Sequence, residues 1–143
     1  MLSKKKEATI FKAARVFAED SRDPDTQVGC IVVSNKGHIL TTGYNGPPRN
    51  VDDSKIPLTR PEKYTFMVHA EANAIYNAAR NGIALEESTF FVTHSPCFKC
   101  LQAIYQVGAE EVVLLPQQHK GWSGEDEIFY NFIKNYIRIR ILK

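Results

Sequence analysis

The sequence predicts an α/β fold of three layers, α/β/α, in which helices cover both faces of a five-stranded mixed sheet. Helical segments alternate with short β-branched segments along most of the chain, which is typical of a mainly parallel sheet. Two early strands separated by the turn residues Asn35, Lys36 and Gly37 add one antiparallel hairpin. The last segment alternates between isoleucine and arginine, as an edge or half-exposed strand does. We expect the 143 residues to form one domain, 1–143.

The elements of the first half follow from apolar spacing and from turn residues. Apolar side chains recur at helical intervals between residues 4 and 19, and SRDPDTQ, residues 21–27, ends this helix. Residues 28–34 predict a buried strand, and residues 38–43 its hairpin partner. The connection from 43 to 68 contains prolines at 47, 48, 57 and 61, and a connection of this length is usually functional or disordered.

The second half alternates between helices and strands. The alanine-rich segment after the long connection is typical of a helix, and Asn81-Gly82 ends it. The next helix has Pro96 near its first turn and Gly108 after its last, and Ser123 is a candidate cap for a final helix. The expected order is helix 69–80, strand 88–94, helix 96–108, strand 110–116, helix 124–135 and strand 137–142.

Composition and charge argue against several classes of protein. The net charge of +2 is too small to favour a nucleic-acid polymer as partner. No run of about 18 apolar residues could span a membrane, and the amino-terminal residues lack the apolar core of a secretory signal. Three cysteines cannot all pair within one chain, and two of them form C-x-x-C. We therefore expect an intracellular, cytoplasmic protein whose thiols bind a metal or perform redox chemistry.

Two short segments carry the chemistry, HAEANAI at 69–75 and SPCFKC at 95–100. Cys97 and Cys100 lie three apart at the start of a helix, so both sulfurs face one side of a turn, and the helix amino terminus favours thiolates. His69 also stands at the start of a helix. In a parallel sheet such helix starts gather at the carboxyl ends of the strands, so the three side chains can converge.

The donor set predicts a catalytic zinc ion. Two thiolates and an imidazole select zinc, and three protein ligands leave one tetrahedral position open for a water whose pKa falls to about 7. Glu71 lies two residues after His69, and residues two apart on a regular helix point to nearly opposite sides. Both can serve one site at a helix end, where His69 holds the metal and Glu71 takes and returns a proton.

Two other uses of the cysteine pair stay open. C-x-x-C can be a redox pair, although the chain has no thioredoxin-like first strand. A structural zinc would need a fourth donor, and the candidates are Cys30, His38, His94 and His119. Cys30 lies in an apolar strand and is expected in the core, and His38 lies beside a turn and is expected at the surface. His94 stands at a strand end, where it could line the site.

The pattern H-x-E followed by P-C-x-x-C resembles the zinc-dependent cytidine deaminase superfamily, of which it is the known signature. The order of elements also looks like the cytidine deaminase-like fold. Within the superfamily the chain is most similar to deoxycytidylate (dCMP) deaminases, through the segments DPDTQVGCIVV, TGYNGPP, HAEANAI and SPCFKC. Deaminases of transfer RNA usually lack the N-A-I ending and the G-Y-N-G context, and free cytidine deaminases generally have a cysteine where His69 stands.

The resemblance implies hydrolytic deamination of dCMP to dUMP with release of ammonia, which supplies dUMP for thymidylate synthesis. Glu71 is the implied catalytic residue, which protonates N3 of the cytosine ring and then helps the amino group leave. The implied zinc ligands are His69, Cys97 and Cys100. The implied substrate contacts are the Asn45 side chain at the sugar hydroxyl, the Ala70 backbone at the pyrimidine edge, the Cys97 backbone amide at the oxygen of the tetrahedral intermediate, and Ser95.

The family also implies assembly and regulation. Many dCMP deaminases are hexamers activated by dCTP and inhibited by dTTP, usually with Mg²⁺, so we expect a homo-oligomer with such effectors. Their effector pocket lies near the G-Y-N-G-x-P loop, and the candidates for effector or phosphate binding here are Tyr44, Asn45, Gly46, Arg49 and Arg80.

The spacing of residues along the sequence does not show which cationic side chain would bind the substrate phosphate. The candidates are Arg22, Arg49, Arg60, Lys63 and Arg80. Arg80 stands about 16 Å along the helix from His69, which suits an effector or a neighbouring subunit better than the same substrate's base.

The chain departs from some relatives in ways that bear on the substrate. It has no room for the extra zinc-binding insertion of some members. QQHKGW, residues 117–122, stands where many relatives place a tyrosine that closes over the substrate, and His119 or Trp122 could take that role. A pocket that tolerates more phosphates would accept dCTP, so deamination of dCTP or another cytosine nucleotide is the alternative activity. A non-catalytic regulator that binds zinc or a nucleotide is the alternative from another class.

Overall fold

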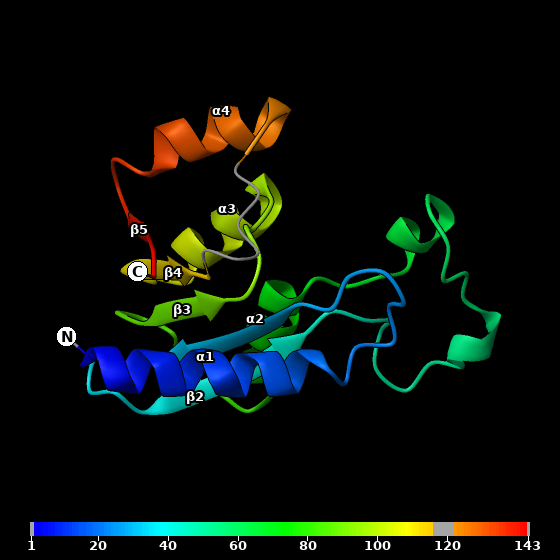
Figure 1. Ribbon diagram of the computed structural model, residues 1–143, viewed down its shortest axis with the longest axis horizontal. Helices are drawn as coiled ribbons and strands as arrows, with labels where there is room; N and C mark the ends of the chain where they lie inside the picture. Colours follow the sequence, from blue (N-terminus) through cyan, green and yellow to red (C-terminus); the bar gives the residue numbers. More distant parts are fainter. Residues whose placement is uncertain (1, 116–121, 143) are drawn as a thin grey trace.

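A five-stranded sheet forms the centre of the computed structural model, with strands in the order β2-β1-β3-β4-β5 (Figure 1). The structure describes residues 2–115 and 122–142. Every helix and strand expected from the sequence is present, with ends that differ by at most two residues. In chain order they are α1 (Lys4–Ala18), β1 (Gly29–Val33), β2 (Ile39–Tyr44), α2 (Ala70–Arg80), β3 (Thr89–Val92), α3 (Phe98–Gln106), β4 (Glu111–Leu114), α4 (Gly124–Ile133) and β5 (Arg138–Ile141).

The sheet is mixed, as predicted, but less parallel than the pattern indicated. Strands β3, β4 and β5 are parallel, whereas β1 pairs antiparallel with both β2 and β3. Only the first of these antiparallel pairs was expected. The second arises because β1 lies between β2 and β3, so the crossover through α2 passes over it. Since β2 and β3 consequently run in the same direction, their carboxyl ends share one edge of the sheet, and α2 and α3 both begin there.

Helices cover both faces of the sheet, which confirms the three-layer prediction. On one face, Ile10, Phe11 and Ala14 of α1 pack against Ile31 and Phe91. On the other face, the buried side chains of three helices, α2, α3 and α4, join one core with those of β1, β3 and β4. The edge strand β5 is only partly buried, as its isoleucine and arginine alternation predicts.

The start of α2 is held tightly against β2. A Cβ atom at Gly43 would lie 2.3 Å from the Ala70 carbonyl oxygen and 2.5 Å from the Ala74 nitrogen, so only glycine permits this approach. The hydroxyl of Thr41 donates to the Ala74 carbonyl at 2.9 Å. These contacts set the place of the residue just before the helix, His69.

The long connection between β2 and α2 is ordered by local contacts, in keeping with a functional rather than a disordered loop. Gly46 and Val68 close its two ends with a pair of backbone hydrogen bonds of 3.0 and 2.7 Å. Between them lie two short 3-10 turns, Asp53–Lys55 and Glu62–Thr65, which project beyond the sheet beside the segment that joins α1 to β1 (Figure 1). The second turn is anchored by the buried Lys63, described below.

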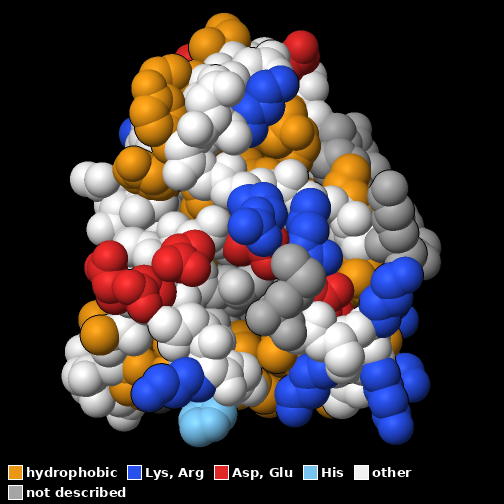
Figure 2. Space-filling view, turned by 90° about the vertical axis from the view of Figure 1, so that its left-hand side faces the viewer, with side chains coloured by type: hydrophobic (Ala, Val, Ile, Leu, Met, Phe, Trp, Pro, Cys, Tyr) orange, Lys and Arg blue, Asp and Glu red, His pale blue; other side chains and the backbone are white. Residues whose placement is uncertain are grey.

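The opposite end of the molecule carries a network of ion pairs. Arg140 of β5 pairs with Glu7 of α1 and with Glu111 of β4, the latter at 3.0 Å, and Arg138 pairs with Glu111 at 3.1 Å. The face shown in Figure 2 carries both acidic and basic side chains. In the described part of the chain, no helix is long and apolar enough to cross a membrane.

Candidate metal centre and nucleotide cavity

Two of the predicted zinc ligands are the residues immediately before a helix. His69 precedes α2 with extended backbone angles, φ −70° and ψ 153°, and Cys97 precedes α3 with φ −70° and ψ 169°. Neither side chain makes the usual capping hydrogen bond to its helix, so both remain available for another partner. Cys100 follows in the first turn of α3. The common direction of β2 and β3 brings these helix starts together.

The three ligand atoms lie at the spacing of a tetrahedral zinc site. His69 Nδ1 is 3.5 Å from Cys97 Sγ and 3.4 Å from Cys100 Sγ, and all three atoms lie within 4.8 Å of one another. Tetrahedral bonds with Zn–S near 2.3 Å and Zn–N near 2.0 Å place sulfur and nitrogen about 3.5 Å apart. The residues present therefore fit zinc with one position left open.

No fourth donor joins this cluster within residues 2–115 and 122–142. Cys30 is fully buried in β1, as expected of a core residue, and His38 is exposed, also as expected. His94 lines the cavity beside the cluster, and His119 lies outside the described residues. In that part of the chain, nothing supports a structural site with four protein ligands.

Glu71 occupies the first turn of α2 and is 5% exposed. Burial raises the pKa of its carboxyl above the usual value, and a hydrogen bond with the Cys100 thiol places it beside the cluster without making it part of the cluster. The spacing of two between His69 and Glu71 is compatible with one site because His69 has extended rather than helical backbone angles. The histidine and the glutamate therefore approach the same cavity from successive positions at the helix tip.

One thiol of the cysteine pair, Cys97, ionises readily at this place, and Cys100 does not. The hydrogen bond from the Cys100 thiol lowers the pKa of Cys97 to about 4; burial opposes this shift, and His69 adds to it. Donating that hydrogen bond raises the pKa of Cys100, and burial raises it further. The negative charge of Cys97 also raises it, because a second thiolate would lie next to the first. The Cys97 hydrogen bond also raises the pKa of His69. A cation between these groups would favour both thiolates.

A cavity of about 290 Å³, the zinc cavity, opens beside the three predicted zinc ligands. All four residues predicted to contact the substrate line it, namely Asn45, Ala70, Ser95 and Cys97. The Asn45 amide is oriented by the neighbouring backbone. Its Oδ1 accepts from the Val28 nitrogen at 2.8 Å, and its Nδ2 donates to the Thr26 carbonyl at 2.9 Å. Asn45 is thus a built part of the cavity wall rather than only a turn residue.

Residues 4–116 match the family model described as "Cytidine and deoxycytidylate deaminase zinc-binding region". The chain belongs to the cytidine and deoxycytidylate deaminase family. It is 37% identical over 113 residues to a probable deoxycytidylate deaminase of Drosophila melanogaster, an alignment that covers 71% of this chain and 55% of the relative. It is 30% identical over 166 aligned positions to the deoxycytidylate deaminase of enterobacteria phage T4, covering 88% of this chain and 86% of the relative.

A solved structure of a member of this family has the same fold. The dCMP deaminase of cyanophage S-TIM5, in its apo form, superposes with a TM-score of 0.77 at 30% identity and covers 99% of both chains. The same enzyme has been solved in complex with dCMP and dUMP, with a TM-score of 0.77 and 26% identity. The present chain spans a little over half the length of the fly relative and almost the whole length of the cyanophage enzyme.

The other residues predicted to bind an effector or a phosphate fall into three groups. Tyr44, Gly46 and Arg49 line a second cavity of about 470 Å³, together with Arg22, Asn73 and Asn77. Arg60 and Lys63 line the zinc cavity instead. Arg80 is exposed at the end of α2 and lines neither cavity. Among the effector candidates, Asn45 lines the zinc cavity, whereas its sequence neighbours Tyr44 and Gly46 line the second cavity. The reason is that successive residues face opposite sides where β2 ends.

Two contacts, one from α4 and one from Trp122 just before it, support the turn that carries Cys97 and Cys100, and sequence reasoning missed their role. Asp126 Oδ1 accepts from the Phe98 backbone nitrogen at 2.8 Å and so satisfies the first amide of α3, a helix whose N-cap residue Cys97 makes no side-chain capping bond. Trp122 Nε1 donates to the Pro96 carbonyl at 2.9 Å, and its ring stacks on Tyr130 with centroids 3.8 Å apart. Trp122 is not among the residues that line the zinc cavity, and its closing over the substrate stays a prediction.

Proposed function

We propose that this protein is a zinc-dependent hydrolase that deaminates dCMP to dUMP and releases ammonia. The observation that carries the proposal is the cluster of His69, Cys97 and Cys100 with the buried Glu71 beside it, at a cavity of about 290 Å³ that His69, Glu71 and Cys97 line. The dCMP and dUMP that accompany the cyanophage enzyme support a cytosine nucleotide as substrate and a uracil nucleotide as product.

The roles of the chain's own groups follow from their places. His69, Cys97 and Cys100 would hold zinc, which when bound supplies the positive charge that activates a water at neutral pH. Glu71 accepts a proton from a water as the water oxygen bonds C4 of the cytosine ring, and it delivers that proton to N3. Glu71 then passes the remaining hydroxyl proton to the amino group, so that the C4–N bond breaks and ammonia leaves. The cavity walls keep bulk water away from the carboxyl, which is 5% exposed.

Orientation of the nucleotide is assigned to the remaining wall residues. The Asn45 amide keeps one lone pair and one hydrogen for the sugar hydroxyl after its two backbone contacts. The Ala70 backbone faces the pyrimidine edge, and the Cys97 amide and Ser95 lie at the helix start where the oxygen of the tetrahedral intermediate develops charge. These groups hold C4 of the base at the ligand cluster.

The decisive experiment is an activity assay on purified, zinc-loaded protein with dCMP. We expect loss of cytosine absorbance with stoichiometric release of ammonia. Glu71→Gln removes the proton carrier and keeps the size of the side chain, so it should lower kcat by about 10²- to 10⁴-fold while zinc content stays near one per chain. If zinc-loaded protein deaminates no cytosine nucleotide, the non-catalytic regulator is the correct assignment, and turnover of dCTP would establish the alternative substrate.

We further propose that the second cavity binds the nucleotide effectors, dCTP as activator and dTTP as inhibitor, each with Mg²⁺. Two arginines, Arg22 and Arg49, line it, and Asn73 and Asn77 of α2 form one wall. Asn73 Nδ2 donates to the Tyr44 carbonyl at 2.7 Å, which ties this wall to the residue next to Asn45. A ligand in the second cavity can therefore act on the sugar-binding side chain through one peptide unit.

Regulation is tested by dCMP saturation curves with and without dCTP or dTTP. Arg49→Gln should raise the half-activating dCTP concentration about 10-fold or more, because it removes a cation from the proposed phosphate site. Arg15→Gln, which removes an exposed charge from α1, is the matched control. Insensitivity of the unmodified protein to both nucleotides would refute the effector assignment. Homo-oligomeric assembly, a cytoplasmic location and a role in supplying dUMP stay predictions from the family.

A further inference from the structure

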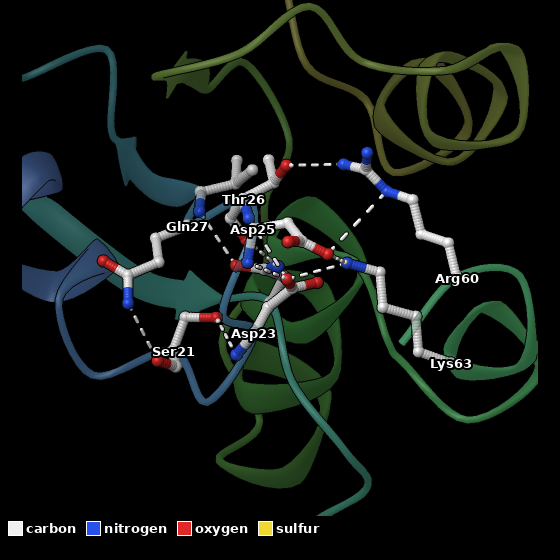
Figure 3. Close-up of polar contacts among 9 residues, drawn as sticks. Ser21, Asp23, Asp25, Thr26, Gln27, Arg60 and Lys63 are labelled. Carbon is white, nitrogen blue, oxygen red and sulfur yellow. Dashed lines mark hydrogen bonds and ion pairs between the residues drawn. The ribbon is translucent and has the colours of Figure 1, made fainter. Parts of the chain in front are cut away.

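Four charged side chains meet at one part of the zinc cavity, and three of them line it. Lys63 and Arg60 come from the long connection, and Asp23 and Asp25 come from the segment between α1 and β1 (Figure 3). Asp23, Arg60 and Lys63 line the cavity itself. Of the five cations that the sequence offered for the substrate phosphate, these two alone line the zinc cavity within the described residues. The choice of phosphate ligand is therefore between Arg60 and Lys63.

Lys63 is already committed to two carboxylates. Its Nζ lies 2.8 Å from Asp23 Oδ1 and 2.8 Å from Asp25 Oδ2, and the side chain is 1% exposed. Releasing it would leave Asp23, itself 6% exposed, as a buried charge without its partner. Lys63 consequently serves to anchor the connection on the 23–25 segment, and its positive charge is neutralised before any ligand arrives.

Arg60 is held loosely by comparison. Its Nη2 is 3.4 Å from Thr26 Oγ1, and its Nε is 3.9 Å from Asp25 Oδ2, both at the long limit of such contacts. The side chain is 56% exposed, and the guanidinium offers five donors in a planar fork that suits phosphate oxygens. A phosphate can replace the distant Asp25 at Arg60, because Asp25 retains its 2.8 Å contact with Lys63.

The positions along the cavity wall also match the order of groups in a nucleotide. The metal ligands and Glu71 stand at the base end. Asn45, the residue assigned to the sugar, donates to the Thr26 carbonyl at 2.9 Å, and Arg60 contacts the Thr26 side chain at 3.4 Å. Thr26 thus contacts both Asn45 and the Arg60 guanidinium. Arg60 therefore stands where the 5′-phosphate would follow the sugar of a bound nucleotide.

We propose that Arg60 binds the 5′-phosphate of the nucleotide in the zinc cavity and is the residue that distinguishes a nucleotide from its nucleoside. The Lys63, Asp23 and Asp25 cluster positions Arg60 and does not contact the phosphate. This inference rests on the proposed cytosine nucleotide deaminase function and names the specificity residue of that same site.

The test compares dCMP with deoxycytidine, which lacks only the phosphate. In Arg60→Gln, kcat/KM for dCMP should fall about 10- to 100-fold, as expected for the loss of a charged hydrogen-bond donor, and kcat/KM for deoxycytidine should stay within about twofold. Arg60→Lys should recover part of the loss because it restores the charge without the fork. Arg15→Gln on α1 is the control for loss of an exposed arginine and should leave both values unchanged.

Calorimetric binding of dCMP, dUMP and deoxycytidine to the zinc-loaded protein separates this inference from the proposed function. Arg60-dependent binding of dUMP without any turnover would support the phosphate site and overturn the deaminase. Deamination of dCMP with an unchanged dCMP to deoxycytidine ratio in Arg60→Gln would overturn the phosphate site alone. An equal loss for both substrates would show that Arg60 is structural, which also contradicts the inference.

Discussion

At the scale of single residues, Asp23 organises the part of the wall that a nucleotide would meet. Its Oδ1 accepts from the backbone nitrogens of Asp25 and Thr26 at 2.8 and 3.1 Å and from Lys63 Nζ at 2.8 Å. Burial opposes ionisation of the carboxyl, but these hydrogen bonds outweigh it and lower the pKa of Asp23 below 3.8. The same carboxylate thereby holds the Thr26 backbone, whose carbonyl accepts a hydrogen bond from the Asn45 amide.

Replacing this carboxylate should reduce stability in a pH-dependent way. Asp23→Ala leaves Lys63 without one partner, so we expect a loss of about 3 kcal/mol in the free energy of unfolding at pH 7. Because the folded pKa is depressed, the stabilisation is complete above the unfolded pKa and is lost as the pH falls through the folded value. Urea unfolding of both proteins should therefore show a gap that is full at pH 7 and narrows below about pH 4.

A surface carboxylate provides the control for this experiment. Asp53 pairs with Arg22 at 3.2 Å in a largely exposed ion pair, and Asp53→Ala should cost less than about 1 kcal/mol. An Asp23→Ala gap that does not change between pH 7 and pH 3 would mean that lost packing, rather than the charge, causes the destabilisation.

At the scale of elements, α2 and α3 share one arrangement in which the residue before the helix turns its side chain to the metal cluster. The amide groups of the first turn then lack the usual capping side chain. For α3 the missing acceptor comes from α4, because Asp126 accepts from the Phe98 nitrogen. Helix α4 thereby stabilises a ligand turn that it does not belong to.

Removing this acceptor should loosen the ligand turn. We expect Asp126→Ala to destabilise the protein by about 1 kcal/mol and to weaken zinc binding, measured by competition with a coloured chelator. Asp126→Asn keeps an oxygen acceptor and should restore most of both quantities. Glu125→Ala, at an exposed neighbouring position, should change neither, and an equal effect of Glu125→Ala would argue against the capping explanation.

The elements also explain which parts of the site were predictable. His69, Glu71 and the two cysteines belong to short segments in which helix caps and spacing of three constrain the side chains locally. The contribution of Asp126 depends on how α4 returns over α3, and the choice of Arg60 over Arg49 depends on the path of a connection without periodicity. The second antiparallel pair of β1 was missed for a similar reason, since strand order is decided by crossovers and not by the strands' own residues.

At the scale of the whole molecule, a metal at the cluster would join two crossovers of the fold. One ligand precedes α2 and two belong to the start of α3, so the ion would connect the helix after β2 with the helix after β3. The opposite end of the sheet is joined by the Arg140, Glu7 and Glu111 ion pairs, which link α1 to β4 and β5. The fold is thus cross-linked near both ends of its strands.

Zinc removal should therefore lower global stability as well as activity. A ligand present at about 1,000 times its Kd stabilises the folded state by about 4 kcal/mol, which for a domain of this size corresponds to roughly 10 °C in Tm. Thermal unfolding of chelator-treated protein, followed by addition of zinc, measures both directions. Cys100→Ala should have the Tm of the zinc-free protein whether or not zinc is added. If the Tm of the unmodified protein did not change after verified metal removal, the cluster would not support the fold.

The burial of Lys63 has a consequence for the chemical reactivity of the chain. The other lysines in residues 2–115 and 122–142 are exposed, whereas Lys63 is enclosed and its pKa is raised by hydrogen bonds to Asp23 and Asp25. Acylating reagents attack only a neutral, accessible amine, so this lysine is shielded in two ways at once. The rate at which the Lys63 amine is acylated would therefore measure how often the cavity wall that carries Arg60 opens.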